Sequence, residues 1–134
     1  MTPTERASLE AMFEAFAPAH HERWSYLLAK RPERWSKISP ILAWPVPSPY
    51  ESFPDKPLAD ILRSEPFVRY LAAPSVILRC GHSPAPSVKT LALREAFPDG
   101  QWDYEVVFEG FISVVPGKLA LGFNHEGGLC AYGA

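Results

Sequence analysis

The stretch QWDYEVVFEGFISVVPGKLALGFNHEGGLCAYGA, residues 101–134, decides the fold class of this chain. Its first part alternates apolar residues with acidic ones: Tyr104, Val106 and Phe108 against Asp103, Glu105 and the out-of-phase Glu109. A period of two residues is typical of a β-strand with one buried face and one solvated face. The first part therefore predicts a strand whose outer face is acidic.

Two turn motifs divide the rest of this stretch. Val115–Lys118 places Pro and then Gly at the central positions of a type II turn. Leu119–Phe123 then predicts a second strand, Asn124–Gly128 a second turn and Leu129–Tyr132 a short third strand. We expect a three-stranded antiparallel meander.

Helical patterns dominate the beginning of the chain. Ala7–Phe16 places Leu9, Met12, Phe13 and Phe16 at helical spacing, with Thr4 as the expected N-cap. Pro18 ends this helix, and His20–Lys30 predicts a second one. A third, shorter helix is expected from Pro32 to Ile38, because proline suits the first helical turn.

The middle of the chain mixes the two patterns. Pro40–Pro57 carries six prolines among apolar residues and predicts an extended loop over the core. Leu58–Leu71 is expected to be a helix that breaks near Pro66, and Val76–Cys80 a short strand. Ser87–Phe97 fits a helix or a strand equally. The whole chain, 1–134, is expected to be one α+β domain in which N-terminal helices pack on a C-terminal antiparallel β-meander.

The amino-acid composition limits the classes of protein to which this chain can belong. An apolar content of 47% supports a single packed core, and no apolar run is long enough to span a membrane. The first six residues lack the apolar region of a secretory signal, so we expect a cytoplasmic protein. Its two cysteines, Cys80 and Cys130, are therefore expected to be reduced.

Charge is unevenly distributed. Residues 1–94 carry 12 Lys/Arg and 9 Asp/Glu, whereas residues 95–134 carry six acids and only Lys118. The two parts thus have formal charges of +3 and −5, within a total of −2. Such segregation favours a role in recognising a basic partner, although acids on a sheet also keep its edge soluble.

No group of residues predicts catalysis or a cofactor. Cys80, His82, His125 and Cys130 are the available soft ligands, but their spacing fits no usual zinc motif, so we expect no metal. His20 and His21 are neighbours on a helix, so their side chains point about 100° apart and are not expected to bind one metal ion together. The acidic row of Asp103, Glu105 and Glu109 fits a solvated or partner-facing surface better than a hydrolytic carboxylate pair.

Two further alternatives remain open. The segment from Arg23 to Lys37 is rich in basic residues and contains three aromatic ones, which suits contact with nucleic acid, but the aromatic residues have the spacing of a buried helical face. A sequence pI of 6.1 is also low for a nucleic-acid-binding protein. The other alternative is a small ligand-binding or enzymatic domain with a pocket between the proline-rich loop and the sheet.

The N-terminal region carries one family resemblance. The residues that carry it are Phe16-Ala17-Pro18-x-His20, Arg23-Trp24, Leu27-Leu28 and Arg34-Trp35. Over about forty residues this pattern resembles bacterial immunity proteins of contact-dependent inhibition and related polymorphic toxin systems. The resemblance implies a cytoplasmic protein, without enzymatic activity, that binds and neutralises a cognate toxin domain.

The acidic residues are the expected contacts with a basic, nuclease-type toxin. They are Asp103, Glu105, Glu109 and Glu126. Apolar anchors of the interface are expected from Trp102, Tyr132 and the Trp44–Phe53 loop, because aromatic side chains supply most of the binding energy in such interfaces.

Overall fold

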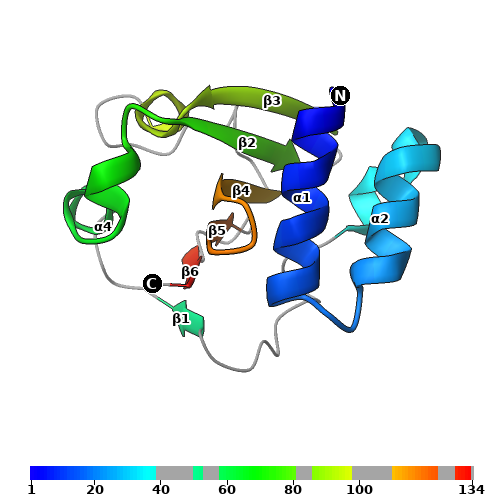
Figure 1. The fold of residues 1–134 in the computed structure, drawn as a ribbon, viewed down its shortest axis with the longest axis horizontal. Helices are drawn as coiled ribbons and strands as arrows, with labels where there is room; N and C mark the ends of the chain where they lie inside the picture. The colour runs from blue at the N-terminus through cyan, green and yellow to red at the C-terminus, as the bar shows by residue number, and fades with distance from the viewer. Residues whose placement is uncertain (39–49, 53–57, 81–85, 98–109, 124–128, 134) are drawn as a thin grey trace.

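The computed structural model describes residues 1–38, 50–52, 58–80, 86–97, 110–123 and 129–133 (Figure 1). Its helical elements are α1 (Pro3–Phe16), α2 (His21–Lys30), α4 (Leu58–Arg63) and the 3₁₀ helices η1 (Pro32–Lys37), η2 (Phe67–Tyr70) and η3 (Leu93–Ala96). Its strands are β1 (Tyr50–Ser52), β2 (Pro74–Arg79), β3 (Ser87–Ala92), β4 (Gly110–Val115), β5 (Leu119–Phe123) and β6 (Leu129–Tyr132). The predicted α+β class is confirmed.

All six described strands form one sheet in the order β1-β6-β5-β4-β2-β3, and every pairing is antiparallel. β4, β5 and β6 are consecutive neighbours and form the predicted meander. Lys118 donates its amide hydrogen to the Val115 carbonyl oxygen over 2.9 Å, and Gly117 has a φ of 69°. The Pro-Gly turn is therefore confirmed, because a type II turn needs positive φ at that position.

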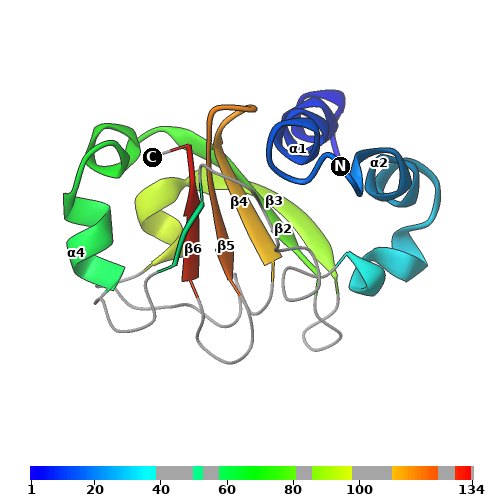
Figure 2. The same cartoon turned by 90° about the horizontal axis from the view of Figure 1, so that it is seen from below.

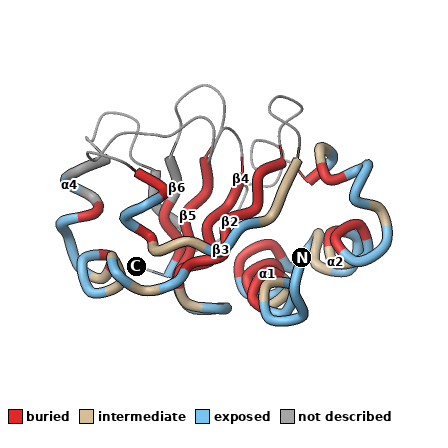
Figure 3. Tube along the Cα trace, turned by 90° about the horizontal axis from the view of Figure 1, so that it is seen from above, coloured by how far each residue is buried: buried red, intermediate tan, exposed pale blue. Residues whose placement is uncertain are grey.

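Helical layers cover both faces of the sheet (Figure 2). One buried cluster joins α1, α2 and η1 to Val76, Leu78, Phe111 and Tyr132. The opposite cluster joins α4, η2 and η3 to the residues that alternate with these, such as Ile77 and Ile112. Successive strand residues point to opposite faces, so both sets are buried (Figure 3).

Burial on both faces is nearly complete in the two strands that flank the Pro-Gly turn. Every residue of β4 from Gly110 to Val114 and every residue of β5 is buried, so these strands have no solvated face. The expected alternating strand at residues 103–109 lies outside the described residues, and β4 is the strand that precedes the Pro-Gly turn.

The helix predictions hold with one correction. α1 begins at Pro3 and its N-cap is Thr2, so the prediction of Thr4 as the cap is wrong. Proline at the first helical position places the cap one residue before it. Pro66 separates α4 from η2 as expected, and the ambiguous Ser87–Phe97 segment divides into a strand and a 3₁₀ turn.

The sheet keeps the two cysteines apart. Cys80 directly follows β2, whereas Cys130 lies in β6, with β4 and β5 between these strands. Three inter-strand steps span about 14 Å, well beyond the roughly 4.4–6.8 Å between the Cα atoms of a disulfide. The two residues therefore cannot form a disulfide with each other or share one metal ion.

Gly110 allows a close approach between the two central strands β4 and β2. A Cβ atom there would lie 1.9 Å from the Leu78 carbonyl oxygen, so β4 and β2 would have to separate. We expect Gly110→Ala to lower the free energy of unfolding by at least about 3 kcal/mol. Urea unfolding followed by circular dichroism measures this loss.

Gly117→Ala is the matched control. Its φ of 69° strains an alanine by about 1–2 kcal/mol, but the new Cβ atom would meet its nearest neighbour, the Ala11 carbonyl oxygen, at 3.4 Å. Equal losses in the two variants would contradict a special role for the contact between Gly110 and Leu78.

Candidate functional site: a pocket between the first helix and the sheet

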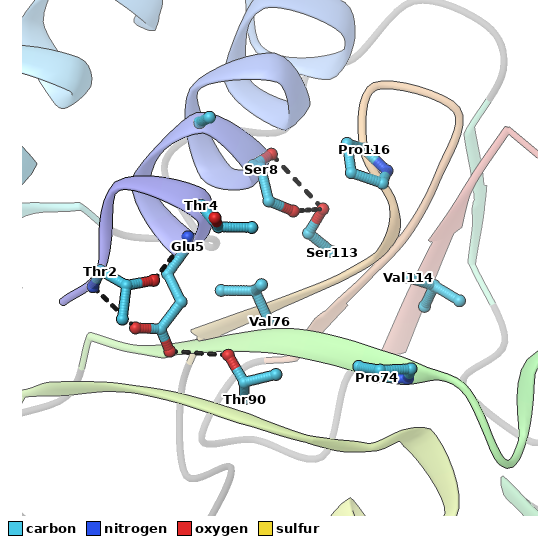
Figure 4. A pocket seen from close by; sticks show the side chains of 11 residues that line it. Thr2, Thr4, Glu5, Ser8, Pro74, Val76, Thr90, Ser113, Val114 and Pro116 are labelled. Carbon is cyan, nitrogen blue, oxygen red and sulfur yellow. Dashed lines mark hydrogen bonds between the residues drawn. The ribbon is translucent and has the colours of Figure 1, made fainter.

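A pocket of about 480 Å³ lies where the first turns of α1 cross the sheet (Figure 4). Residues from α1, β2, β3 and the end of β4 line it. They are Thr2, Thr4, Glu5, Ala7, Ser8, Pro74, Val76, Thr90, Ser113, Val114 and Pro116. Pairing shifts from Ser113↔Ala120 to Val115↔Leu119, so Val114 is an extra residue in a β-bulge at the pocket's edge.

Glu5 links the start of α1 to the edge strand β3. Its carboxylate accepts the Thr2 amide hydrogen over 2.8 Å, while the Thr2 hydroxyl oxygen accepts the Glu5 amide hydrogen over 3.1 Å. This reciprocal pair is a capping box. The second carboxylate oxygen accepts the Thr90 hydroxyl hydrogen over 2.7 Å. One side chain therefore caps the start of α1 and fixes it against β3.

These hydrogen bonds favour the charged form of Glu5. The Thr2 amide has the largest effect and the Thr90 hydroxyl the next, and together they lower the pKa of Glu5 below its usual value of 4.5. Partial burial opposes this shift without reversing it. Glu5 is therefore a carboxylate at neutral pH.

Two serines form a buried polar contact deeper in the pocket. The Ser8 and Ser113 hydroxyl oxygens lie 2.8 Å apart, and the Ser113 hydroxyl also donates to the Ser8 carbonyl oxygen over 3.4 Å. Ser8 is 6% exposed and Ser113 is 1% exposed. This contact joins α1 to β4 across 105 positions of sequence.

The acidic residues predicted to bind a partner lie outside the described residues. These are Asp103, Glu105, Glu109 and Glu126; Trp102 and residues 44–49 and 53 of the proline-rich loop also lie outside. In the register of the described strands, Gly110 pairs with Phe123 and Phe123 pairs with Leu129. The start of β4, the end of β5 and the start of β6 therefore lie at the same end of the sheet.

Tyr132 was expected to anchor a partner, but its side chain is 0% exposed. Its ring lies 5.5 Å from that of Phe16, on the sheet face that α1 covers. Tyr132 is therefore part of the core and is not available as a surface anchor, since a partner cannot reach a fully buried ring.

The aromatic residues of the basic segment are mostly buried too. Trp24 is 4% exposed and Trp35 is 9% exposed, while Tyr26 remains 56% exposed. Trp24 packs edge-on against Phe13, and the Trp35 indole donates to the Leu27 carbonyl oxygen over 2.9 Å. These tryptophans have the buried positions that their spacing predicts, so they cannot stack on bases.

The described residues contain neither a cluster of metal ligands nor a helix suited to crossing a membrane. Within the described ranges, no three His, Cys, Asp or Glu side chains come close enough together to hold a metal ion. His82, His125 and the Cys130 side chain lie outside them. None of the helices described here combines the length and hydropathy that crossing a membrane requires.

Glu5, Ser8, Thr90 and Ser113 were not predicted as site residues. Thr2-x-x-Glu5 matches the capping-box pattern and was readable from the sequence. Ser113 is the only polar side chain in the apolar β4 strand, which is a weaker signal.

Comparison with known proteins did not identify a family for this chain. No protein-family model, curated protein or solved structure matches this chain.

Replacing Glu5 is expected to change the pH dependence of stability. A lowered pKa in the folded state stabilises the fold above the unfolded pKa, near 4.5, and this stability is lost as pH falls through the folded value. Glu5→Gln should therefore be less stable than the wild type at neutral pH, by less than about 1 kcal/mol because the carboxylate is mostly exposed. The difference should shrink below pH 4.5.

Urea unfolding at several pH values measures this difference. Glu14→Gln removes an exposed carboxylate from the same helix, outside the capping box, and gives the effect of losing one negative charge. A difference between Glu5→Gln and wild type that grows as pH falls would contradict the assigned pKa direction.

The buried serine contact should behave as a coupled pair. Ser113→Ala leaves the Ser8 hydroxyl buried without this partner, so we expect a loss of about 1–2 kcal/mol in unfolding free energy. The double variant Ser8→Ala with Ser113→Ala should lose less than the sum of the single variants. Strict additivity, measured by urea unfolding, would show that the two hydroxyls contribute independently.

Proposed function

We propose that this protein works by binding another protein, as an immunity protein that neutralises a cognate toxin domain in the cytoplasm. The observation that supports the proposal is that β4 begins and β5 ends at one end of the sheet, where Gly110 pairs with Phe123. The sequences that precede β4 and follow β5, residues 98–109 and 124–128, contain five acidic residues and no Lys or Arg: Asp99, Asp103, Glu105, Glu109 and Glu126.

Chain connectivity limits how far apart these charges lie. Glu109 directly precedes Gly110, and Glu126 is three residues from both Phe123 and Leu129. Three residues span at most about 11 Å. Glu109 and Glu126 are therefore tethered close to one sheet end, and carboxylates that lie near each other add to a common negative potential, which attracts a basic surface and accelerates association.

The N-terminal resemblance to immunity proteins agrees with this role. An inhibitor of a nuclease has to cover a basic, phosphate-binding surface, and an acidic protein surface is complementary to it. The nucleic-acid alternative has less support, because Trp24 and Trp35 are buried in the core. The proposed action is binding, without a reaction catalysed by this chain.

Reversing two of these charges tests the proposal. The partner to use is the toxin-like product of the neighbouring gene, first captured by pull-down. We expect Glu105→Lys with Glu109→Lys to slow association roughly tenfold or more at low salt, because electrostatic steering is lost. The effect should weaken at physiological salt, where the Debye length is about 8 Å.

A second double reversal, Glu14→Lys with Glu22→Lys, is the matched control. Both residues are exposed on the N-terminal helices, and the change in net charge is the same. Circular dichroism should show that both double variants fold. If no protein partner binds, or if both double variants slow association equally, the proposed interface is wrong.

A further inference from the structure

The pocket beside α1 has the dimensions of a small-molecule site. Its volume of about 480 Å³ lies within the range of roughly 300–1,000 Å³ that is typical of ligand pockets. Pro74, Val76, Val114 and Pro116 provide apolar walls. Because these residues belong to paired strands and the turn that follows β4, the pocket is preformed.

The pocket contains one carboxylate. Glu5 is the single ionisable side chain among its eleven lining residues, all of which are described, and the N-terminal ammonium group lies near enough to help lower the pKa of Glu5. Each Glu5 carboxylate oxygen accepts one hydrogen bond, from the Thr2 amide or the Thr90 hydroxyl. A carboxylate oxygen has a second acceptor position, so both oxygens retain capacity for a ligand.

The buried serines use part of their hydrogen-bonding capacity within their own pair. Their hydroxyl oxygens lie 2.8 Å apart and either can be the donor, and the Ser113 hydroxyl also lies 3.4 Å from the Ser8 carbonyl oxygen. The Thr90 proton is directed to Glu5. A ligand that donates hydrogen bonds therefore suits these groups better than one that accepts them.

From this complementarity we propose that the pocket binds a small molecule with an apolar body and one cationic amine. The body lies against Val76 and the two prolines, and the amine is directed to the Glu5 carboxylate. Charge-assisted hydrogen bonds stabilise the amine, whereas a carboxylate or phosphate ligand is repelled by Glu5. This site is independent of the proposed toxin-binding surface.

Three probes that share one skeleton test the ligand class. Phenethylamine is cationic, 2-phenylethanol is neutral and phenylacetate is anionic at neutral pH. We expect the amine to bind roughly three- to tenfold more tightly than the alcohol, and phenylacetate to bind most weakly. Titrations followed by NMR of isotope-labelled full-length protein give the affinities and show whether signals of pocket residues shift.

Glu5→Gln isolates the role of the charge. Glutamine is also found at this position of a capping box, so the helix start is retained. The preference for the amine over the alcohol should fall to about twofold or less, because only the uncharged hydrogen bonds remain. Glu14→Gln, on the same helix but outside the pocket, should keep the wild-type preference.

A third variant tests the location. Ala7→Phe adds a ring at the pocket wall and should weaken all three probes by a similar factor. The proposal is overturned if no probe shifts pocket signals, if the wild type binds amine and alcohol equally, or if Glu14→Gln abolishes the preference as Glu5→Gln does. Failure of toxin binding would leave these outcomes unaffected.

Discussion

The burial of β2 and β4 on both faces is the constraint on which the rest of the structure depends. Val76 and Leu78 face the cluster formed with α1 and α2, while Ile77 faces the opposite cluster. A shift of one residue in register would exchange these two sets and place each against the wrong helices. Only a small residue fits where β4 approaches the Leu78 carbonyl oxygen most closely, and Gly110 provides it.

This constraint explains which elements could be predicted from the sequence. α1 and α2 each bury one side, so their apolar residues recur at helical spacing and the helices were predictable. β2 and β4 are buried on both sides and show no alternation, so an apolar run is their only signal. β5 was found because the Pro-Gly turn marks its start. Ser87–Phe97 stayed ambiguous because it contains an edge strand and then a 3₁₀ turn.

The candidate pocket was less predictable because its contacts are not local. The link between Thr90 and Glu5 spans 85 positions, and the serine contact spans 105. Neither pair leaves a periodic pattern, since each depends on where α1 crosses the sheet. Tyr132 illustrates the opposite error: an aromatic ring near the end of the chain suggests an interface, but its position opposite Phe16 places it in the core.

The sheet separates the two candidate sites. Arg79 and Gly110 pair at the end of the sheet where β4 begins, whereas Pro74 at the other end of β2 lines the pocket. The length of β2 is about 17 Å, since a strand rises roughly 3.3 Å per residue. Glu5 bonds to Thr90, which pairs with Val76, and Val76 lies three residues, or about 10 Å, from Arg79. This separation still exceeds the Debye length of about 8 Å at physiological salt, so solvent ions screen the effect of Glu5 at that end. The two proposed sites therefore use different residues, and each can be altered without replacing a residue of the other.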